Sequence, residues 1–314
     1  MNKIPVIMDV DTGIDDAVAL MLAMSADELD IKGITTVAGN QTIEKTTRNT
    51  LDVVEYFGRQ DIPVARGYSK PLVREQIIAA YAHGESGLGT AVLPEAKKHA
   101  EKLDAVSFIR KTLEESEEKI TLVPTGPLTN IAILLLSYPH LKEKIEKIVL
   151  MGGGAYTGNS NAVAEFNILA DPEAANVVFA SGVQIVMCGL DVTLKAIITS
   201  SEIEQLKALG NKAGDFAAEA FSFYLNMYRK NRKNNELDGC AVHDAVTIVY
   251  LTHPELIRTK SGTATVDIDG KYTYAATAVD FTPWRDKTKD NVLVGVDIDR
   301  DAFAQLVLDA CKKY

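Results

Sequence analysis

Short apolar segments rich in β-branched residues alternate along the first two thirds of the chain with longer segments whose apolar positions repeat at helical spacing. The first pair is a strand predicted over Ile4–Val10 and a helix over 15–24, and the second is a strand over 31–37 and a helix over 43–57. This alternation is typical of β-α-β units, in which helices cover both faces of a mostly parallel sheet. The pattern therefore predicts an α/β fold.

The same alternation continues to residue 187. Further strands are expected at 64–65, 120–123, 148–151 and 183–187, and further helices at 103–115, 128–136 and 172–181. After residue 200 we expect helices at 201–209, 214–226 and 243–251, a polar connection at 228–238, and a hairpin in which strands 263–269 and 272–278 flank Asp269–Gly270. Because no Pro/Ser-rich linker or internal repeat interrupts the chain, we predict one Rossmann-like domain over 1–314 with a late β-hairpin.

Composition narrows the range of partners. The 33 Lys and Arg against 43 Asp and Glu give a net charge of −10, which disfavours a nucleic-acid partner. Three widely spaced cysteines, Cys188, Cys240 and Cys311, form neither a disulfide framework nor a CxxC metal motif. The N-terminus does not resemble a signal peptide, and no apolar run approaches the ~18 residues of a membrane span. We therefore expect a cytoplasmic protein that does not bind membranes.

Four carboxylates crowd the end of the first predicted strand, at Asp9, Asp11, Asp15 and Asp16. Ligands of parallel sheets bind at the carboxyl ends of the strands. Carboxylates this close repel one another unless protons or a cation neutralise them, and hard cations such as Ca²⁺ and Mg²⁺ prefer carboxylate oxygens. Helix capping explains Asp15 and Asp16 but not the other two. The cluster therefore predicts a metal or catalytic site.

Two known carboxylate motifs fit this segment poorly. An EF-hand loop starting at Asp9 would need Gly and Glu at its sixth and twelfth positions, which hold Ile14 and Leu20. The DxDx(T/V) motif of haloacid-dehalogenase-type phosphatases would need Thr or Val where Gly13 stands. A Mg²⁺-dependent phosphatase of that type stays an alternative, as does a non-catalytic protein that binds ribose or a nucleoside.

The segment 9–16, DVDTGIDD, resembles the DxDxGxDD opening of the inosine–uridine-type nucleoside hydrolases. The resemblance continues in order through the chain, in VAGN at 37–40, HGESGL at 83–88, TGPLTN at 125–130, MGGG at 151–154, GN at 158–159, EFN at 165–167, DPEA at 171–174 and HD at 243–244. It covers residues from about 4 to past 250. It implies an enzyme that hydrolyses the N-glycosidic bond of ribonucleosides to give ribose and the free base.

The resemblance also implies a Ca²⁺ ion with oxygen ligands. Its ligands would be the side chains of Asp11, Asp16 and Asp244 and the backbone carbonyl of Thr125. Asp11 would in addition act as the general base that takes a proton from the attacking water. Asp9 would orient Asp11 or the adjacent loop. A turn residue before Gly126–Pro127 is the alternative interpretation of Thr125.

For the sugar, the resemblance implies a set of short polar side chains next to strand ends and glycine turns. Asp15, Asn40 and Asn167 would contact the 2′- and 3′-hydroxyls, Asn159 and Glu165 would contact the 5′-hydroxyl, and Met151 would pack against the ribose. Turn capping explains the two asparagines Asn40 and Asn167 as well, and Met151 also suits a core position. Contacts that strengthen as positive charge develops on the ring favour the transition state.

On the base side, His243 is the first candidate for the general acid, because histidine changes charge near neutral pH. His83 in the HGESGL segment is a second candidate. Phe166 could flank the base. Tyr224 and Tyr228 lie four residues apart and share a helix face, either at the base pocket or in a core stripe.

The resemblance favours the branch that contains His243, and so pyrimidine nucleosides such as uridine and cytidine, with inosine as an alternative substrate. It also implies a homodimer or homotetramer.

Overall fold

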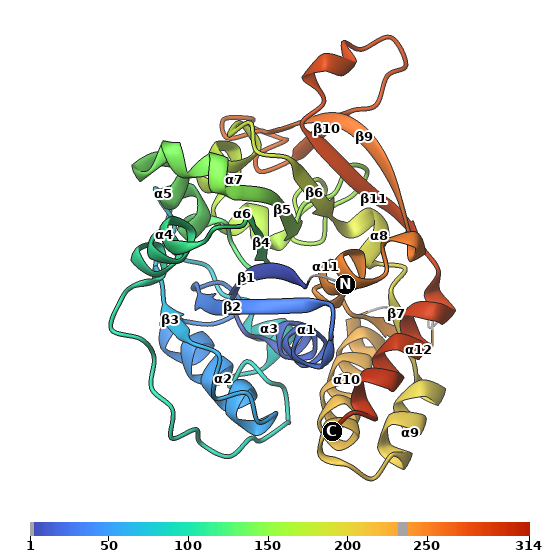
Figure 1. Cartoon of the computed structure of the whole chain (residues 1–314). Helices are drawn as coiled ribbons and strands as arrows, with labels where there is room; N and C mark the ends of the chain where they lie inside the picture. The colour runs from blue at the N-terminus through green and yellow to red at the C-terminus, as the bar shows by residue number, and fades with distance from the viewer. Residues whose placement is uncertain (1–2, 232–237) are drawn as a thin grey trace.

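The computed structural model, which describes residues 3–231 and 238–314, has a nine-stranded sheet at its centre (Figure 1). The strand order is β10-β9-β11-β6-β5-β4-β1-β2-β3, and neighbours from β11 to β3 are parallel, whereas β9 and β10 are antiparallel additions. The strands are β1 Ile4–Val10, β2 Leu29–Thr36, β3 Val64–Arg66, β4 Ile120–Pro124, β5 Ile145–Met151, β6 Ile185–Cys188, β9 Ile257–Val266, β10 Thr277–Asp280 and β11 Val292–Ile298.

Helices cover both faces of this sheet. They are α1 Ile14–Ser25, α2 Ile43–Tyr56, α3 Ala80–His83, α4 Ala105–Glu115, α5 Thr129–Ser137, α6 Phe166–Ala170, α7 Pro172–Phe179, α8 Leu190–Thr193, α9 Ser200–Ala208, α10 Lys212–Asn231, α11 Ala245–Thr252 and α12 Arg300–Cys311, with 3-10 turns η1 Pro139–Lys144, η2 Pro254–Leu256 and η3 Lys287–Lys289. In β1, Val6 and Met8 join the core beneath α1, while Ile7 joins the core beneath α4 and α5. Strands buried on both faces are near-continuous apolar runs, which explains the apolar sequence of β1 up to Asp9.

The order of the strands creates a crevice beside β1. From β1 the chain moves outward through β2 and β3 on one side, and it returns through β4, β5 and β6 on the other. In open parallel sheets, ligands bind at the carboxyl ends of the strands where the order reverses. The backbone N–H of Thr125, just after β4, donates to the carbonyl of Asp9 in β1 at 2.9 Å. The residues after β1 and β4 therefore meet at this point.

The α/β fold and the late hairpin are confirmed, but the prediction that the hairpin turns at Asp269–Gly270 is wrong. The second strand, β10, begins only at Thr277. The Asp267 carboxylate accepts the N–H groups of Asp269 and Gly270 and the hydroxyl of Thr273, and these bonds hold residues 267–276 in a compact loop. Local side-chain bonds to the backbone compete here with strand pairing.

Several elements near the end of the chain have no counterpart in the predicted pattern. They are β11, α12 and a separate two-stranded antiparallel sheet of β7 Ile197–Thr199 and β8 Gly239–Ala241. Helix α10 extends to Asn231, so the predicted polar connection starts as helix, and residues 232–237 of it lie outside the described residues.

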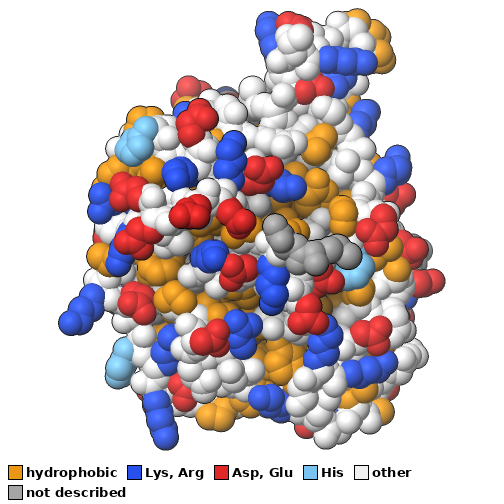
Figure 2. Space-filling model, in the orientation of Figure 1, with side chains coloured by type: hydrophobic (Ala, Val, Ile, Leu, Met, Phe, Trp, Pro, Cys, Tyr) orange, Lys and Arg blue, Asp and Glu red, His pale blue; other side chains and the backbone are white. Residues whose placement is uncertain are grey.

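Figure 2 shows Lys and Arg interspersed with Asp and Glu across the visible face. No described helix combines the length and apolar character that a membrane span needs.

Candidate active site

A cavity of about 450 Å³ opens at the carboxyl end of the sheet. Most of the side chains expected to bind the nucleoside or the metal line it, although they come from distant parts of the chain. These residues are Asp15, Asn40, His83, Thr125, Met151, Asn159, Glu165, Phe166, Asn167, Tyr224, His243 and Asp244. Asp11 and Asp16 are fully buried behind this lining.

The Asp11 carboxylate sits in a cradle that requires glycine on two sides. A Cβ on Gly126 would lie 2.8 Å from its Cγ, and one on Gly39 would collide with its Oδ2. The backbone N–H of Asn40 donates to Oδ2 at 2.6 Å, whereas Oδ1 is buried without a hydrogen-bond partner among the described residues. Burial, followed by the charge of Asp16, raises the pKa of Asp11 well above its usual value. The position therefore calls for a proton or a cation at Oδ1.

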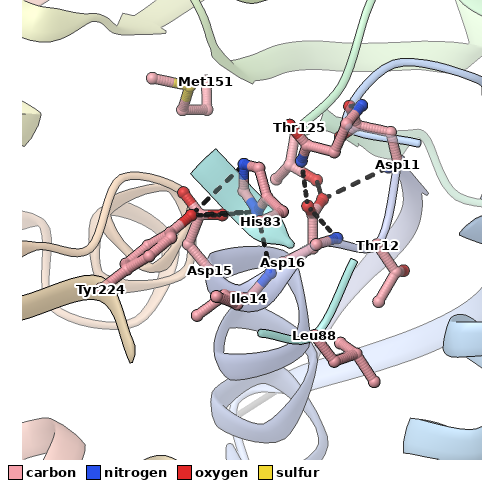
Figure 3. Close-up of polar contacts among 12 residues, drawn as sticks. Asp11, Thr12, Ile14, Asp15, Asp16, His83, Leu88, Thr125, Met151 and Tyr224 are labelled. Atoms are coloured by element: carbon pink, nitrogen blue, oxygen red, sulfur yellow. Dashed lines mark hydrogen bonds and ion pairs between the residues drawn. The ribbon is translucent and has the colours of Figure 1, made fainter. Parts of the chain in front are cut away.

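Asp16 organises the turn between β1 and α1. Its Oδ2 accepts the N–H of Gly13 at 2.9 Å and the Asn40 side chain at 3.0 Å, and its Oδ1 accepts the Thr125 hydroxyl at 2.7 Å (Figure 3). A Cβ on Gly13 would lie 2.8 Å from the Asn40 side-chain nitrogen and would strike the ring of His83. The close approach of these side chains explains why glycine stands here.

Carboxylate oxygens of Asp15, Asp16 and Asp244 all lie within 4.8 Å of one another, and the three residues are buried. We refer to these three residues as the acidic cluster. Burial, followed by the charges of Asp15 and Asp16, raises the pKa of Asp244 well above its usual value. A site that offers only oxygen donors suits a hard cation. Asp16 and Asp244, which were expected to be metal ligands, lie close together. Asp15, which was expected at the ribose, lies with them.

Asn40 connects Asp11 to this cluster, because its backbone N–H reaches Asp11 and its side chain reaches Asp16. The carbonyl of Thr125, expected to bind the metal, accepts the Asn167 side chain at 2.7 Å. The same Asn167 nitrogen contacts the carbonyl of Met151 at 3.1 Å. Asn167 thereby holds the ends of β4 and β5 together at the cavity.

Glu165 is a buried carboxylate at the start of α6. Its Oε2 accepts the backbone N–H groups of Gly153 at 3.0 Å, Asn167 at 2.9 Å and Ile168 at 3.4 Å. Burial nevertheless dominates and raises the pKa of Glu165 to about 7. Next to it, Asn159 is exposed and its Oδ1 accepts the N–H of Phe166 at 3.0 Å. These bonds fix the wall expected at the 5′-hydroxyl.

His83, Tyr224 and Asp15 form a buried hydrogen-bonded group (Figure 3). The Tyr224 hydroxyl donates to Asp15 Oδ1 at 2.9 Å and lies 3.1 Å from His83 Nδ1. The N–H of Ile14 donates to the same Nδ1 at 3.2 Å, so Nδ1 acts as an acceptor and the neutral ring carries its proton on Nε2. Burial lowers the pKa of His83, which favours this neutral form.

His243 is half-buried on the cavity wall, and its Nδ1 lies 2.8 Å from the hydroxyl of Thr193. Burial lowers the pKa of His243, and the nearby charge of Asp15 opposes that effect. No motif in the sequence pointed to Thr193, which lies 50 residues before His243 and comes from α8.

The cavity is also lined by residues to which the sequence assigned no role: Ala79, Tyr81, Ala82, Thr157, Gly158, Leu194 and Met227. Of these, Tyr81 lies two residues before the HGESGL segment and is 69% exposed, so its proximity to that segment was the available signal. Tyr224 lines the cavity and also packs in the core beside Phe221 and Leu225. This position therefore belongs both to the cavity wall and to a core stripe. The backbone of Tyr228 continues α10, but its side chain lies outside what the structure describes.

Comparison with known proteins places these residues in a family. The family model described as inosine-uridine preferring nucleoside hydrolase matches residues 6–305. The pyrimidine-specific ribonucleoside hydrolase RihA of Shigella boydii is 47% identical over 311 residues, which cover 99% of both chains.

Solved structures agree with this match along the whole chain. A purine-preferring ribonucleoside hydrolase from Gardnerella vaginalis superposes with a TM-score of 0.91 at 34% identity, over 99% of this chain and 100% of that one. A plant nucleoside hydrolase superposes with the same TM-score at 32% identity, over 99% of each chain. The chain therefore belongs to the family of inosine-uridine preferring nucleoside hydrolases, and it is a ribonucleoside hydrolase, an enzyme of the N-glycosidase class.

Proposed function

We propose that this enzyme hydrolyses pyrimidine ribonucleosides, uridine and cytidine before inosine, with a Ca²⁺ ion held by the buried carboxylates of the cavity. The observation that carries the proposal is the convergence of Asp15, Asp16 and Asp244 beside Asp11 at the end of β1. The preference for pyrimidines is supported by the 47% identity to a relative whose name specifies that substrate class.

The residues fit a hard divalent cation. Asp11 Oδ1 is a buried carboxylate oxygen without a hydrogen-bond partner among the described residues, and mutual repulsion within the acidic cluster disfavours full ionisation without a cation. Asp11, Asp16, Asp244 and the carbonyl of Thr125 would hold the ion. When bound, it would supply positive charge that favours the ionised form of a water molecule near neutral pH. We favour Ca²⁺ because the donors are all oxygen atoms and three of them are carboxylates.

Different side chains of the protein carry out the separate steps of the reaction. The C1′–N bond breaks with its electron pair passing to the base, a water oxygen bonds to C1′, and Asp11 accepts the proton of that water. His243 gives a proton to the departing base. Asp15, Asn40 and Asn167 orient the sugar hydroxyls, and their negative ends face the ring as positive charge develops on it.

The rest of the cavity would hold the remaining parts of the nucleoside. Glu165 and Asn159 would bind the 5′-hydroxyl, and Met151 would pack against the ribose. Phe166, His83 and Tyr224 would border the base, and Tyr228 would join them from the same helix. Tyr81, Leu194 and Met227 add to this wall because they line the same cavity.

We further propose that the enzyme acts in the cytoplasm as a homodimer or homotetramer. Its three cysteines are free and buried, which suits a reducing compartment. Light scattering coupled to size exclusion tests the assembly, and a monomer at micromolar concentration would contradict it.

The experiment that tests the substrate proposal measures kcat/KM for uridine, cytidine, inosine and adenosine with the calcium-loaded enzyme. We expect the two pyrimidine nucleosides to be the best substrates. A higher kcat/KM for adenosine or inosine would contradict the base preference. Calorimetric titration of Ca²⁺ into metal-stripped enzyme tests the ion separately, and no binding at millimolar Ca²⁺ would contradict it.

A further inference from the structure

Helix α8 is a single turn that ends one residue before the cavity-lining Leu194 and lies outside all of the sequence blocks of the active site. It begins after Gly189, whose carbonyl accepts the N–H of Thr193 at 3.0 Å. Its last residue is Thr193, and the next residue, Leu194, lines the cavity. Thr193 itself is fully buried. A buried hydroxyl beside a cavity requires a partner, and Thr193 has one in the ring of His243 at 2.8 Å.

The same turn is also bonded to the segment that follows β5. The Asp191 carboxylate accepts the N–H of Ala155 at 2.7 Å and the N–H of Tyr156 at 3.2 Å. Those two residues lead into Thr157 and Asn159, which line the cavity. Because α8 is held at both sides, its Thr193 hydroxyl occupies a fixed position relative to the cavity.

We propose that Thr193 is a positioning residue that fixes the orientation and tautomer of His243, so that the ring presents Nε2 to the departing base. This inference rests on the proposed role of His243 as the proton donor.

The geometry of the imidazole ring supports this assignment. Nδ1 and Nε2 lie on different edges of the ring, so a hydrogen bond that engages Nδ1 with Thr193 turns the Nε2 edge away from α8. In the proposed arrangement the Thr193 hydroxyl, 2.8 Å from Nδ1, accepts a hydrogen bond from Nδ1–H both before and after the ring gives up its Nε2 proton. One proton would then stay on Nδ1 throughout, and the proton that leaves would come from Nε2.

The C1′–N bond breaks and its electron pair stays on the base nitrogen, while the Nε2 proton of His243 moves to the base. The water oxygen forms the new bond to C1′ and its proton passes to Asp11. The neutral His243 ring keeps its Nδ1 proton, which is hydrogen-bonded to the hydroxyl of Thr193. The ring regains its Nε2 proton from solvent.

A kinetic comparison separates a positioning role from a structural one. Uridine needs a proton on its leaving group, whereas nitrophenyl riboside has a leaving group that departs without one. We expect Thr193→Val to lower kcat for uridine at least ~10-fold and to leave nitrophenyl riboside within about 3-fold, because general acid catalysis contributes about 10²- to 10⁴-fold. Thr193→Ser should recover most of the lost rate, since it restores the hydroxyl.

The matched control is Thr112→Val in α4, which removes a hydroxyl that donates to the carbonyl of Phe108 at 2.9 Å and that does not line the cavity. We expect this variant to leave both substrates unchanged. Equal loss on both substrates in Thr193→Val, or no loss on uridine, would overturn the proposal.

His243→Ala distinguishes failure of this inference from failure of the proposed function. If His243→Ala slows both substrates equally, the role of His243 as the acid is wrong. If it slows uridine alone while Thr193→Val does not, only the role of Thr193 is wrong.

A second measurement does not depend on the stability of the Thr193 variants. In wild-type enzyme labelled with ¹⁵N-histidine, with the His243 signal assigned by its loss in His243→Ala, we expect the neutral ring to be protonated on Nδ1. A neutral His243 ring protonated on Nε2 instead would overturn the proposal.

Discussion

The hydroxyl of Tyr224 in α10 donates a hydrogen bond to the carboxylate of Asp15 in α1 at 2.9 Å, although 209 residues separate the two in sequence. Both side chains are buried, at 3% and 5% exposure. A hydrogen bond to a charged group contributes more than one between neutral groups. The bond therefore ties the wall on the base side to the acidic cluster.

Tyr224→Phe tests the contribution of this bond. Loss of a hydrogen bond to a buried charge costs about 1.5–3 kcal/mol, so we expect kcat/KM for uridine to fall roughly 10- to 100-fold. Tyr56→Phe is the matched control, because its hydroxyl bonds to the carbonyl of Lys212 at 3.2 Å on another part of α10. A Tyr224→Phe variant with wild-type kcat/KM would show that the bond has no role in turnover.

Asp11→Asn tests the proposed base. The amide keeps the shape of the carboxylate and an oxygen that accepts the N–H of Asn40, so the variant should fold, but it cannot accept a proton from water. We expect uracil release from uridine to fall by about 10²- to 10⁴-fold. Asp27→Asn, on the exposed turn after α1, is the control for loss of one negative charge. Turnover by Asp11→Asn at the wild-type rate would remove Asp11 from the mechanism.

Removal of the metal should lower the stability of the enzyme. A ligand present at 100 times its Kd stabilises the folded state by about 2.7 kcal/mol, so we expect chelation to lower Tm by several degrees and added Ca²⁺ to restore it. Asp244→Asn removes one charge of the acidic cluster and should make Tm much less sensitive to Ca²⁺. Differential scanning calorimetry with and without chelator provides the measurement. An unchanged Tm on chelation of wild-type enzyme would contradict the proposed site.

Glu165 should make the stability of the metal-free enzyme depend on pH. Burial raises its pKa from 4.5 to about 7, so the folded protein holds this proton more tightly than the unfolded chain. The free energy of unfolding from this group therefore falls as pH rises from about 4.5 to about 7. One proton corresponds to at most about 1.4 kcal/mol per pH unit.

Glu165→Gln removes that contribution. In urea unfolding at pH 5, 6 and 7 with chelator present, we expect the variant to lose less stability across this range than the wild type. Identical slopes for the two proteins would show that Glu165 does not change its protonation on unfolding.

The sequence predicts some parts of this molecule because their signals are local. The alternation that predicted β1 and α1 reflects burial on both faces of the sheet, and the crowding of Asp9, Asp11, Asp15 and Asp16 is visible within eight residues. Asp244 has no such local signal, and only its resemblance to the family's HD pair connected it to the others. The structure brings it to Asp15 and Asp16 across more than 220 residues of sequence.

Other features depend on contacts that sequence spacing does not encode. The bond between Thr193 and His243 joins α8 to the residue before Asp244. Thr193 and its sequence neighbours do not form a recognisable motif. The predicted position of the hairpin turn was wrong for a related reason. The side chain of Asp267 accepts the backbone N–H groups of Asp269 and Gly270, which a continued strand would otherwise pair with its neighbour.

Uracil release from uridine and from 2′-deoxyuridine, each measured in chelator and again after Ca²⁺ is added back, tests the central claim most directly. We expect uridine to be hydrolysed only after Ca²⁺ is restored, and 2′-deoxyuridine to be slower by roughly 10²-fold or more, because polar groups built to bind the missing hydroxyl lose their partner. Hydrolysis of uridine at the full rate in chelator, or equal rates for the two nucleosides, would contradict the assignment of the buried carboxylates as a calcium-dependent ribose-binding centre.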